Sequence, residues 1–303
     1  PKPQNPVMSP LIEPDRIIKS RTGRAHSRFA QVAATKMLLS LDDVTSMVAK
    51  QEDPSIGYVF DAPIHYICLN RPDNLITKDF ISKFMKILDK VEDTEGPGVL
   101  ICYGTGSKRF STGYDGEAIA EDQRIMVETD RMFRKLMERI MTFCLPTACI
   151  FNGDAYATGF YLGMCFDFRA MPRNDQFRIC LAEANMGMHL PYVYAKILDR
   201  KLGPRIAQRL MMGIKVKHRE ALQDRIVDYT YADAEDLAVQ IKIFRKRCAH
   251  IGLNRSATKQ NKAMVNDDIL RAARILRIEF ADHIIFTGHN SFSSLRELGH
   301  LFE

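Results

Sequence analysis

The sequence lacks several features, and each absence excludes a class of protein. No apolar run approaches the roughly 18–20 residues that a membrane-spanning helix needs, so we expect no transmembrane segment. None of the seven cysteines stands in a Cys-x-x-Cys pair. The two Cys/His pairs, at residues 65–68 and 248–250, have no second pair at zinc-site spacing, so no metal site is expected.

Charge and composition are those of an ordinary globular protein. Lys and Arg total 43 against 37 for Asp and Glu, and the resulting +6 is too weak to indicate nucleic-acid binding. Hydrophobic residues make up 46% and charged residues 26%, which excludes a wholly disordered chain. The odd number of cysteines, scattered mainly through apolar runs, predicts buried free thiols in a reducing compartment.

Residues 1–56 do not show the pattern of a globular core. Residues 1–14 contain five prolines, and residues 16–41 contain six basic residues and no acidic one. An Arg-rich, acid-poor segment resembles an organelle transit peptide, but it also suits a solvated basic arm or an arm that docks on a partner. We predict that this basic N-terminal extension lies outside the core and contacts another chain.

From residue 57 onward, short apolar segments alternate with stretches of helical periodicity. Thr77 can cap a helix that runs to about residue 93, and a second long helix is predicted over 121–143. Residues beyond 191 are predicted to be helical to the end of the chain. Strands separated by helices indicate an α/β layered core. The predicted strands cover residues 57–63, 64–70, 99–103, 147–151, 166–170 and 177–181.

Two loops stand out on chemical grounds, at residues 110–115 and 152–159. Each follows a short apolar strand and places small residues before a helix-like run. Small residues let backbone N–H groups approach a ligand oxygen, and a helix N-terminus adds the positive end of a dipole. Two such loops could together form an oxyanion hole with two donors.

An ordered series of short motifs runs through the chain. The motifs are Asn70-Arg71-Pro72, residues 108–115, Pro146, Asn152-Gly153, Gly159, Glu183, Gly187, Pro191, Glu220-Ala221-Leu222 and Ile226-Val227-Asp228. This series resembles the crotonase (enoyl-CoA hydratase/isomerase) superfamily over about residues 57–240. Residues 110–115 (FSTGYD) and the spacing of Glu183 to Pro191 are most similar to the Δ3,Δ2-enoyl-CoA isomerase branch.

This resemblance implies an α/β fold, a crotonase-like spiral of βαβ turns over residues 57–240. A C-terminal helical region over 241–303 would help to form a homotrimer. It also implies an acyl-CoA substrate, a coenzyme A thioester, and no separate cofactor.

The resemblance further implies that two backbone N–H groups hold the thioester oxygen. By position these belong to Tyr114 and Thr158, with Gly113, Gly159 and Tyr161 lining the pocket. Thr158 departs from the Gly or Ala usual in the family, and its β-branch narrows the pocket.

The carboxylates decide the implied reaction. Hydratases of the family use two glutamates to place a water; Tyr161 stands at the first position and Glu183 at the second. One carboxylate can carry a proton from C2 to C4 of a 3-enoyl thioester, so isomerisation is favoured over hydration. We expect Glu183 to be catalytic, with its pKa raised by burial.

Two classes of function stay open. One is an enoyl-CoA isomerase, mitochondrial or alternatively peroxisomal. The other is a catalytically weak or inactive structural subunit of a larger mitochondrial assembly, which the basic extension favours.

Other polar candidates are interpreted as structural: His65 within a strand, and Asp115 and Asp154 in turns. Ser111 lacks the partners of a hydrolase triad.

Overall fold

The computed structural model describes residues 39–106, 108–186, 190–279, 284–287 and 291–294. Its main sheet has six strands in the order β1-β2-β3-β5-β7-β9, and only the β1–β2 pair is antiparallel. The strands are β1 (Ile56–Asp61), β2 (Ile64–Leu69), β3 (Val99–Gly104), β5 (Thr147–Ile150), β7 (Phe168–Pro172) and β9 (Tyr229–Tyr231).

Three very short parallel strands form a second sheet. Each of its strands follows a strand of the main sheet along the chain, so successive βαβ turns contribute to both sheets. This repetition confirms the predicted α/β organisation. The short strands are β4 (Arg109–Ser111), β6 (Asp154–Tyr156) and β8 (Ile179–Cys180).

The helices between the strands follow the predicted periodicity closely. In α3 (Lys78–Glu92) the Thr77 side chain accepts a hydrogen bond from the Phe80 N–H, as expected for an N-cap. The long helix predicted over 121–143 is α5 (Arg124–Met141), and a separate short helix, α4 (Gly116–Glu121), precedes it and is divided from it at residues 122–123. The division occurs because Asp122 is extended and its carboxylate binds the Arg124 N–H.

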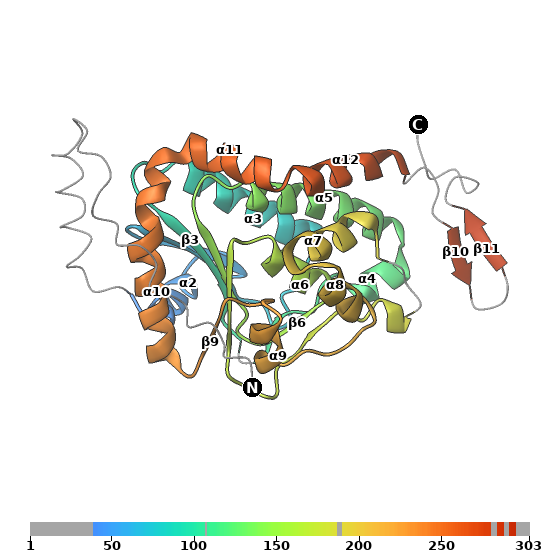
Figure 1. The fold of residues 1–303 in the computed structure, drawn as a ribbon, viewed down its shortest axis with the longest axis horizontal. Coiled ribbons are helices and arrows are strands. Elements are labelled where there is room, and N and C mark those ends of the chain that lie inside the picture. Colours follow the sequence, from blue (N-terminus) through green and yellow to red (C-terminus); the bar gives the residue numbers. More distant parts are fainter. Residues whose placement is uncertain (1–38, 107, 187–189, 280–283, 288–290, 295–303) are drawn as a thin grey trace, which may run out of the picture. The chain divides into compact units, whose positions relative to one another are not determined.

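The remaining helices pack around the sheets (Figure 1). The prediction of helix alone after residue 191 is wrong in two places. β9 joins the edge of the main sheet, and β10 (Ile284–Thr287) pairs antiparallel with β11 (Ser291–Ser294). The helices are α6 (Ala157–Met164), η1 (Ala184–Met186), α7 (Tyr192–Leu202), α8 (Pro204–Met211), α9 (His218–Gln223), α10 (Ala234–Cys248), η2 (Ala249–Asn254), α11 (Arg255–Val265) and α12 (Asp267–Glu279).

Alternate side chains of the central strands enter two apolar clusters, one on each face of the main sheet. Ile67 and Leu69 of β2 belong to the larger cluster, with α3, α5 and α7. Tyr66 and Cys68 of the same strand belong to the smaller cluster, which α10 and an N-terminal helix cover. Figure 1 shows these two helices close together beside the sheet.

That N-terminal helix, α2 (Leu41–Val48), corrects the predicted limit of the extension at residue 56. A capping box begins this helix. The Ser40 side chain accepts a hydrogen bond from the Asp43 N–H, and the Asp43 side chain accepts one from the Ser40 N–H. Val44 and Val48 are fully buried in the smaller cluster. The packed core therefore begins before residue 57, while residues 1–38 lie outside the described part of the chain.

We predict that Val48→Ala lowers the free energy of unfolding by about 2 kcal/mol, through lost apolar burial and a residual cavity. Val48 is completely buried and lies directly against Gly57. The neighbouring Met47 is 46% exposed, so Met47→Ala is the matched control and should change stability by about 0.5 kcal/mol or less. Urea unfolding of both variants checks this, and equal effects would contradict the packing of α2.

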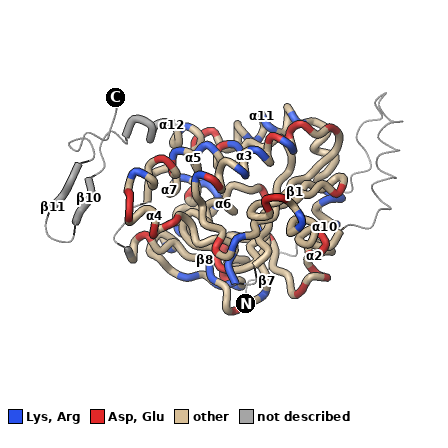
Figure 2. Tube along the Cα trace, turned by 180° about the vertical axis from the view of Figure 1, so that it is seen from behind, with Lys and Arg blue, Asp and Glu red and all other residues tan. Residues whose placement is uncertain are grey.

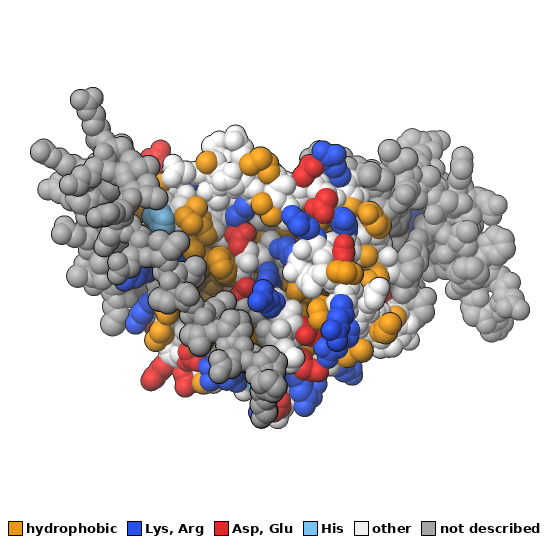
Figure 3. All heavy atoms as spheres, viewed as in Figure 1, with side chains coloured by type: hydrophobic (Ala, Val, Ile, Leu, Met, Phe, Trp, Pro, Cys, Tyr) orange, Lys and Arg blue, Asp and Glu red, His pale blue; other side chains and the backbone are white. Residues whose placement is uncertain are grey.

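The seven cysteines are free and buried, as predicted. Burial raises the pKa of the Cys165 thiol to about 12, which keeps it protonated near neutral pH. No helix among the residues described is long and apolar enough to span a membrane. Basic and acidic residues are distributed along the whole described chain (Figure 2), and their side chains are interspersed on the face seen in Figure 3.

Candidate active site

The two loops singled out in the sequence meet between β4 and the start of α6. β4 and β6 pair in parallel, with Ser111 opposite Ala155. Gly113 adopts a φ of +93°, which favours glycine. A Cβ placed on it would lie 3.0 Å from the Thr158 Oγ1 and 3.3 Å from the Thr158 backbone nitrogen. The backbone before Tyr114 therefore runs directly against the first turn of α6.

Both predicted donor N–H groups are geometrically free to bind a ligand. The Gly113 carbonyl accepts a hydrogen bond of 2.8 Å from the Ile76 N–H. Because a trans peptide points its C=O and N–H in opposite directions, the Tyr114 N–H points away from Ile76. Thr158 is the second residue of α6, where an N–H has no acceptor inside the helix. Neither N–H donates a hydrogen bond to any residue in the described ranges.

Glu183 lies directly before η1 and is partly buried. Its Oε2 is buried and has no hydrogen-bond partner among the residues described. Burial raises the pKa of this carboxyl above its usual value, against the opposing effect of a hydrogen bond from its own backbone N–H. A carboxyl in this state can exchange protons closer to neutral pH than an exposed glutamate.

The charge of this carboxyl acts on Tyr161 of α6. Tyr161 lies three residues after Thr158 on α6, so both side chains occupy one face of the helix. The Tyr161 side chain is fully buried, and its pKa is raised first by burial and then by the charge of Glu183. The Tyr161 hydroxyl and the Thr158 Oγ1 also have no partner within the described part of the chain.

A buried polar cluster behind Tyr114 was missed in the sequence. The Asp130 Oδ1 accepts hydrogen bonds of 3.0 Å from the Tyr114 hydroxyl and 2.5 Å from the Tyr194 hydroxyl. The Asp130 Oδ2 lies 2.6 Å from Arg134, one helical turn later on α5. The Tyr194 ring is 4.6 Å from the Tyr161 ring. This cluster anchors the side chain of Tyr114, whose N–H is a predicted donor.

Asp130 could have been detected from its position on the helix. It stands three and seven residues before the buried Phe133 and Met137, on the apolar face of α5. A carboxylate at such a position needs partners when it is buried. The tyrosine partners come from distant parts of the chain, so only the fold brings them together.

We predict that Asp130→Ala destabilises the protein by about 3–5 kcal/mol, because it removes one member of a buried ion pair. The matched control is Asp89→Ala, since Asp89 pairs with Arg139 but its side chain is 62% exposed. That variant should cost about 1 kcal/mol or less. Thermal and chemical unfolding measure both effects, and a small effect of Asp130→Ala would mean that the cluster is not a structural anchor.

The other polar candidates have structural contacts. Asp115 caps α4 by accepting from the Ala118 N–H at 3.1 Å. Asp154 accepts from the Arg178 N–H at 2.7 Å. Ser111 donates to the Asn74 carbonyl at 2.8 Å. The buried His65 ring contacts the Tyr58 hydroxyl at 2.9 Å, and burial lowers the pKa of His65 to about 4.

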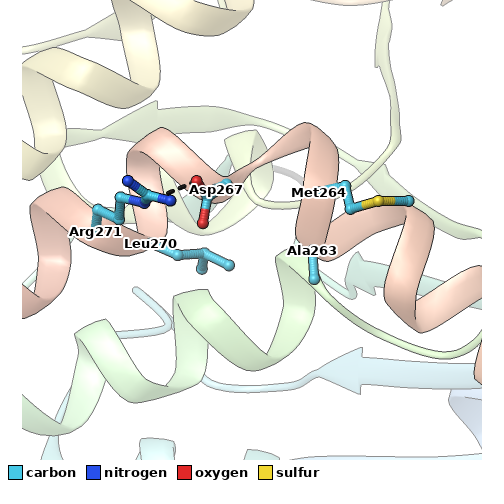
Figure 4. A pocket seen from close by; sticks show the side chains of 5 residues that line it. All are labelled: Ala263, Met264, Asp267, Leu270 and Arg271. Atoms are coloured by element: carbon cyan, nitrogen blue, oxygen red, sulfur yellow. Dashed lines mark ion pairs between the residues drawn. The ribbon is translucent and has the colours of Figure 1, made fainter.

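Two surface cavities lie away from this site. One of about 410 Å³ is on α11 and α12, where Asp267 and Arg271 form an ion pair of 2.8 Å (Figure 4). The other, of about 520 Å³, is lined by basic residues that include Lys201 and Lys262. Neither involves Tyr114, Thr158 or Glu183.

Residues 187–189, between Glu183 and Pro191, lie outside the described ranges, so the predicted pocket with Glu183 on its opposite wall stays a prediction.

Comparisons with known proteins agree with the fold and show the family. The family model described as enoyl-CoA hydratase/isomerase matches residues 60–289. An Arabidopsis thaliana protein named enoyl-CoA delta isomerase 2, peroxisomal, is 26% identical over 169 residues, or 52% of this chain and 69% of the relative. A crotonyl-CoA hydratase of Syntrophomonas wolfei is 28% identical over 218 residues, or 68% of this chain and 81% of the relative.

Among solved structures, human mitochondrial delta3-delta2-enoyl-CoA isomerase is similar with a TM-score of 0.66 at 21% identity. The superposition covers 74% of this chain and 87% of the human one. This likeness confirms the predicted spiral of βαβ turns.

Proposed function

The chain belongs to the enoyl-CoA hydratase/isomerase family, and we propose that it is an enoyl-CoA Δ3,Δ2-isomerase acting on acyl-CoA thioesters. The observation that carries the proposal is the partly buried Glu183 carboxyl, whose Oε2 has no hydrogen-bond partner in the described part of the chain. Glu183 is half-buried and its pKa is raised, and the family resemblance assigns Tyr161 to the position at which a hydratase holds its other glutamate. No cofactor besides the coenzyme A of the substrate is needed.

In the proposed reaction the thioester oxygen accepts hydrogen bonds from the Tyr114 and Thr158 N–H groups. The Glu183 carboxylate takes a proton from C2 of the 3-enoyl chain, and the electron pair passes into the thioester as a dienolate. The two N–H groups stabilise the negative charge that develops on the oxygen. Glu183 then returns the proton to C4, which leaves a 2-enoyl thioester and an unchanged enzyme.

Hydration is the competing reaction, because curated relatives include a crotonyl-CoA hydratase as well as isomerases. Hydration needs one group to activate water and another to protonate carbon, and Tyr161 is a poor base since its pKa is raised by burial. Proton NMR of 3-hexenoyl-CoA with the purified protein tests the proposal. We expect 2-hexenoyl-CoA to form at least about 100-fold faster than any 3-hydroxy product. Faster hydration would overturn it.

A second candidate function is a weakly active or inactive structural subunit. Thr158 favours it, because the β-branched side chain at a donor position narrows the space beside the N–H. The same NMR experiment separates the two functions: absence of any turnover, together with Glu183→Gln behaving as wild type, would support the structural subunit.

The cellular site is proposed to be mitochondrial, with the peroxisome as alternative, since similar isomerases carry both names. We propose a homotrimer, or membership of a larger complex reached through the basic extension. Native electrophoresis of organelle extracts tests this. Comigration with a large complex, lost on deleting residues 1–37, would favour the subunit, and migration as a small oligomer in both cases would favour the free isomerase.

A further inference from the structure

Three buried polar atoms of the site have no hydrogen-bond partner in the described ranges. They are the Tyr161 hydroxyl, the Thr158 Oγ1 and the Glu183 Oε2. Tyr161 is completely buried and Thr158 is 7% exposed. Because buried polar groups are nearly always hydrogen-bonded, these atoms need partners that the described residues do not supply, and a bound ligand can provide them.

The three residues come from the first two turns of α6 and from the position directly before η1. Thr158 and Tyr161 share a face of α6, and the Glu183 charge raises the pKa of Tyr161. The Thr158 Oγ1 lies beside Gly113, in the loop that carries the Tyr114 N–H. A hydrocarbon acyl chain held there would leave both hydroxyls unpaired in an apolar surrounding, where an unpaired hydroxyl is unfavourable.

We propose that this site selects acyl thioesters that carry an oxygen function, a hydroxyl or a carbonyl, close to the reacting carbons, and that Tyr161 is the residue that selects it. The inference rests on the proposed acyl-CoA function and narrows its substrate class. The Tyr161 hydroxyl donates to the substrate oxygen, and the Thr158 hydroxyl supplies a further contact. A site built to bind a hydroxyl discriminates strongly against the analogue that lacks it.

Binding of unreactive thioesters tests the proposal without requiring turnover. Isothermal titration would compare butyryl-CoA with 3-hydroxybutyryl-CoA and 4-hydroxybutyryl-CoA. We expect at least one hydroxylated thioester to bind about 10-fold more tightly than butyryl-CoA, which is one hydrogen bond gained by an otherwise unpaired group. Equal affinities for all three would mean that solvent alone satisfies the hydroxyls, and would overturn the proposal.

Tyr161→Phe and Tyr66→Phe form a matched pair of variants. The Tyr66 hydroxyl is also buried without a partner in the described residues, but it belongs to the apolar cluster on the other face of the sheet. Tyr161→Phe should abolish the preference for the hydroxylated thioester, whereas Tyr66→Phe should retain it. A preference that survives Tyr161→Phe would overturn the role of this residue.

Thermal unfolding provides a readout that does not depend on ligand. Tyr161→Phe removes an unpaired buried hydroxyl, so the melting temperature of the free protein should not fall and should rise by a few degrees. A clear fall would mean that the hydroxyl is already paired, which would also overturn the proposal. If none of the three thioesters binds to the folded wild-type protein, the proposed acyl-CoA function fails together with the inference.

Discussion

Glu183→Gln should lower kcat for isomerisation of a 3-enoyl-CoA by about 10²–10⁴-fold, because the amide cannot accept the proton from C2. Glutamine keeps the size of the side chain, so binding of the thioester and the unfolding temperature should change little. The matched control is Glu128→Gln on α5. Glu128 pairs with Lys78 but its side chain is 58% exposed, and this variant should keep wild-type kinetics.

The pH dependence of kcat/KM tests independently whether Glu183 carries the proton. The reaction needs the Glu183 carboxylate, so kcat/KM should fall as the pH drops through the pKa of this group. Burial raises that pKa, so the acid limb should lie at higher pH than for an exposed glutamate near 4.3. An acid limb at the ordinary value, or a Glu183→Gln variant within tenfold of wild type, would refute Glu183 as the proton carrier.

The predictability of the fold depends on how long each element is. α3 could be predicted because Thr77 and five regularly spaced apolar side chains act together over more than three turns. β4, β6 and β8 contain only two or three residues each, too few for an alternating pattern. Each of these strands forms its hydrogen bonds with a strand of a neighbouring turn of the spiral. Those partners are far apart in the sequence, so the sequence pattern does not reveal the pairing.

α2 shows a different reason for a missed element. Its capping pair, Ser40 and Asp43, was readable, but only Val44 and Val48 mark a buried face in eight residues. A helix that short gains its stability from packing on β1 and β2 rather than from its own sequence. The basic residues before it made the whole segment resemble an extension.

For the site, the family resemblance was confirmed, while the residue roles that it implies stay predictions. Motif order located Tyr114, Thr158 and Glu183, because the loops that carry them have fixed spacing in the sequence. It could not locate the contacts of Asp130 with Tyr114 and Tyr194, which join three separate elements.

Gly159→Ala should reduce stability and activity together, because Gly159 allows α6 to approach β4. A Cβ at this position would lie 2.5 Å from the Ser111 carbonyl oxygen and 2.6 Å from the Ser111 Oγ. The first of these atoms is backbone, so the helix and the strand must move apart. We expect a loss of about 1–3 kcal/mol from overpacking.

The same displacement would separate the two donors of the proposed oxyanion hole. Thr158 directly precedes Gly159, and Tyr114 follows Ser111 by three residues. Loss of one aligned donor lowers kcat by about 10²–10³-fold in other enzymes, so we expect a fall of that order.

Gly116→Ala is the matched control, because a Cβ there meets nothing within 4 Å at the start of α4. Alanine favours a helix, so this variant should be as stable as wild type or slightly more stable. Thermal unfolding gives the melting temperatures of the two variants, and isomerisation kinetics are then measured below both temperatures. A folded Gly159→Ala protein that isomerises at the wild-type rate would exclude the Tyr114 and Thr158 N–H groups as a jointly positioned oxyanion hole.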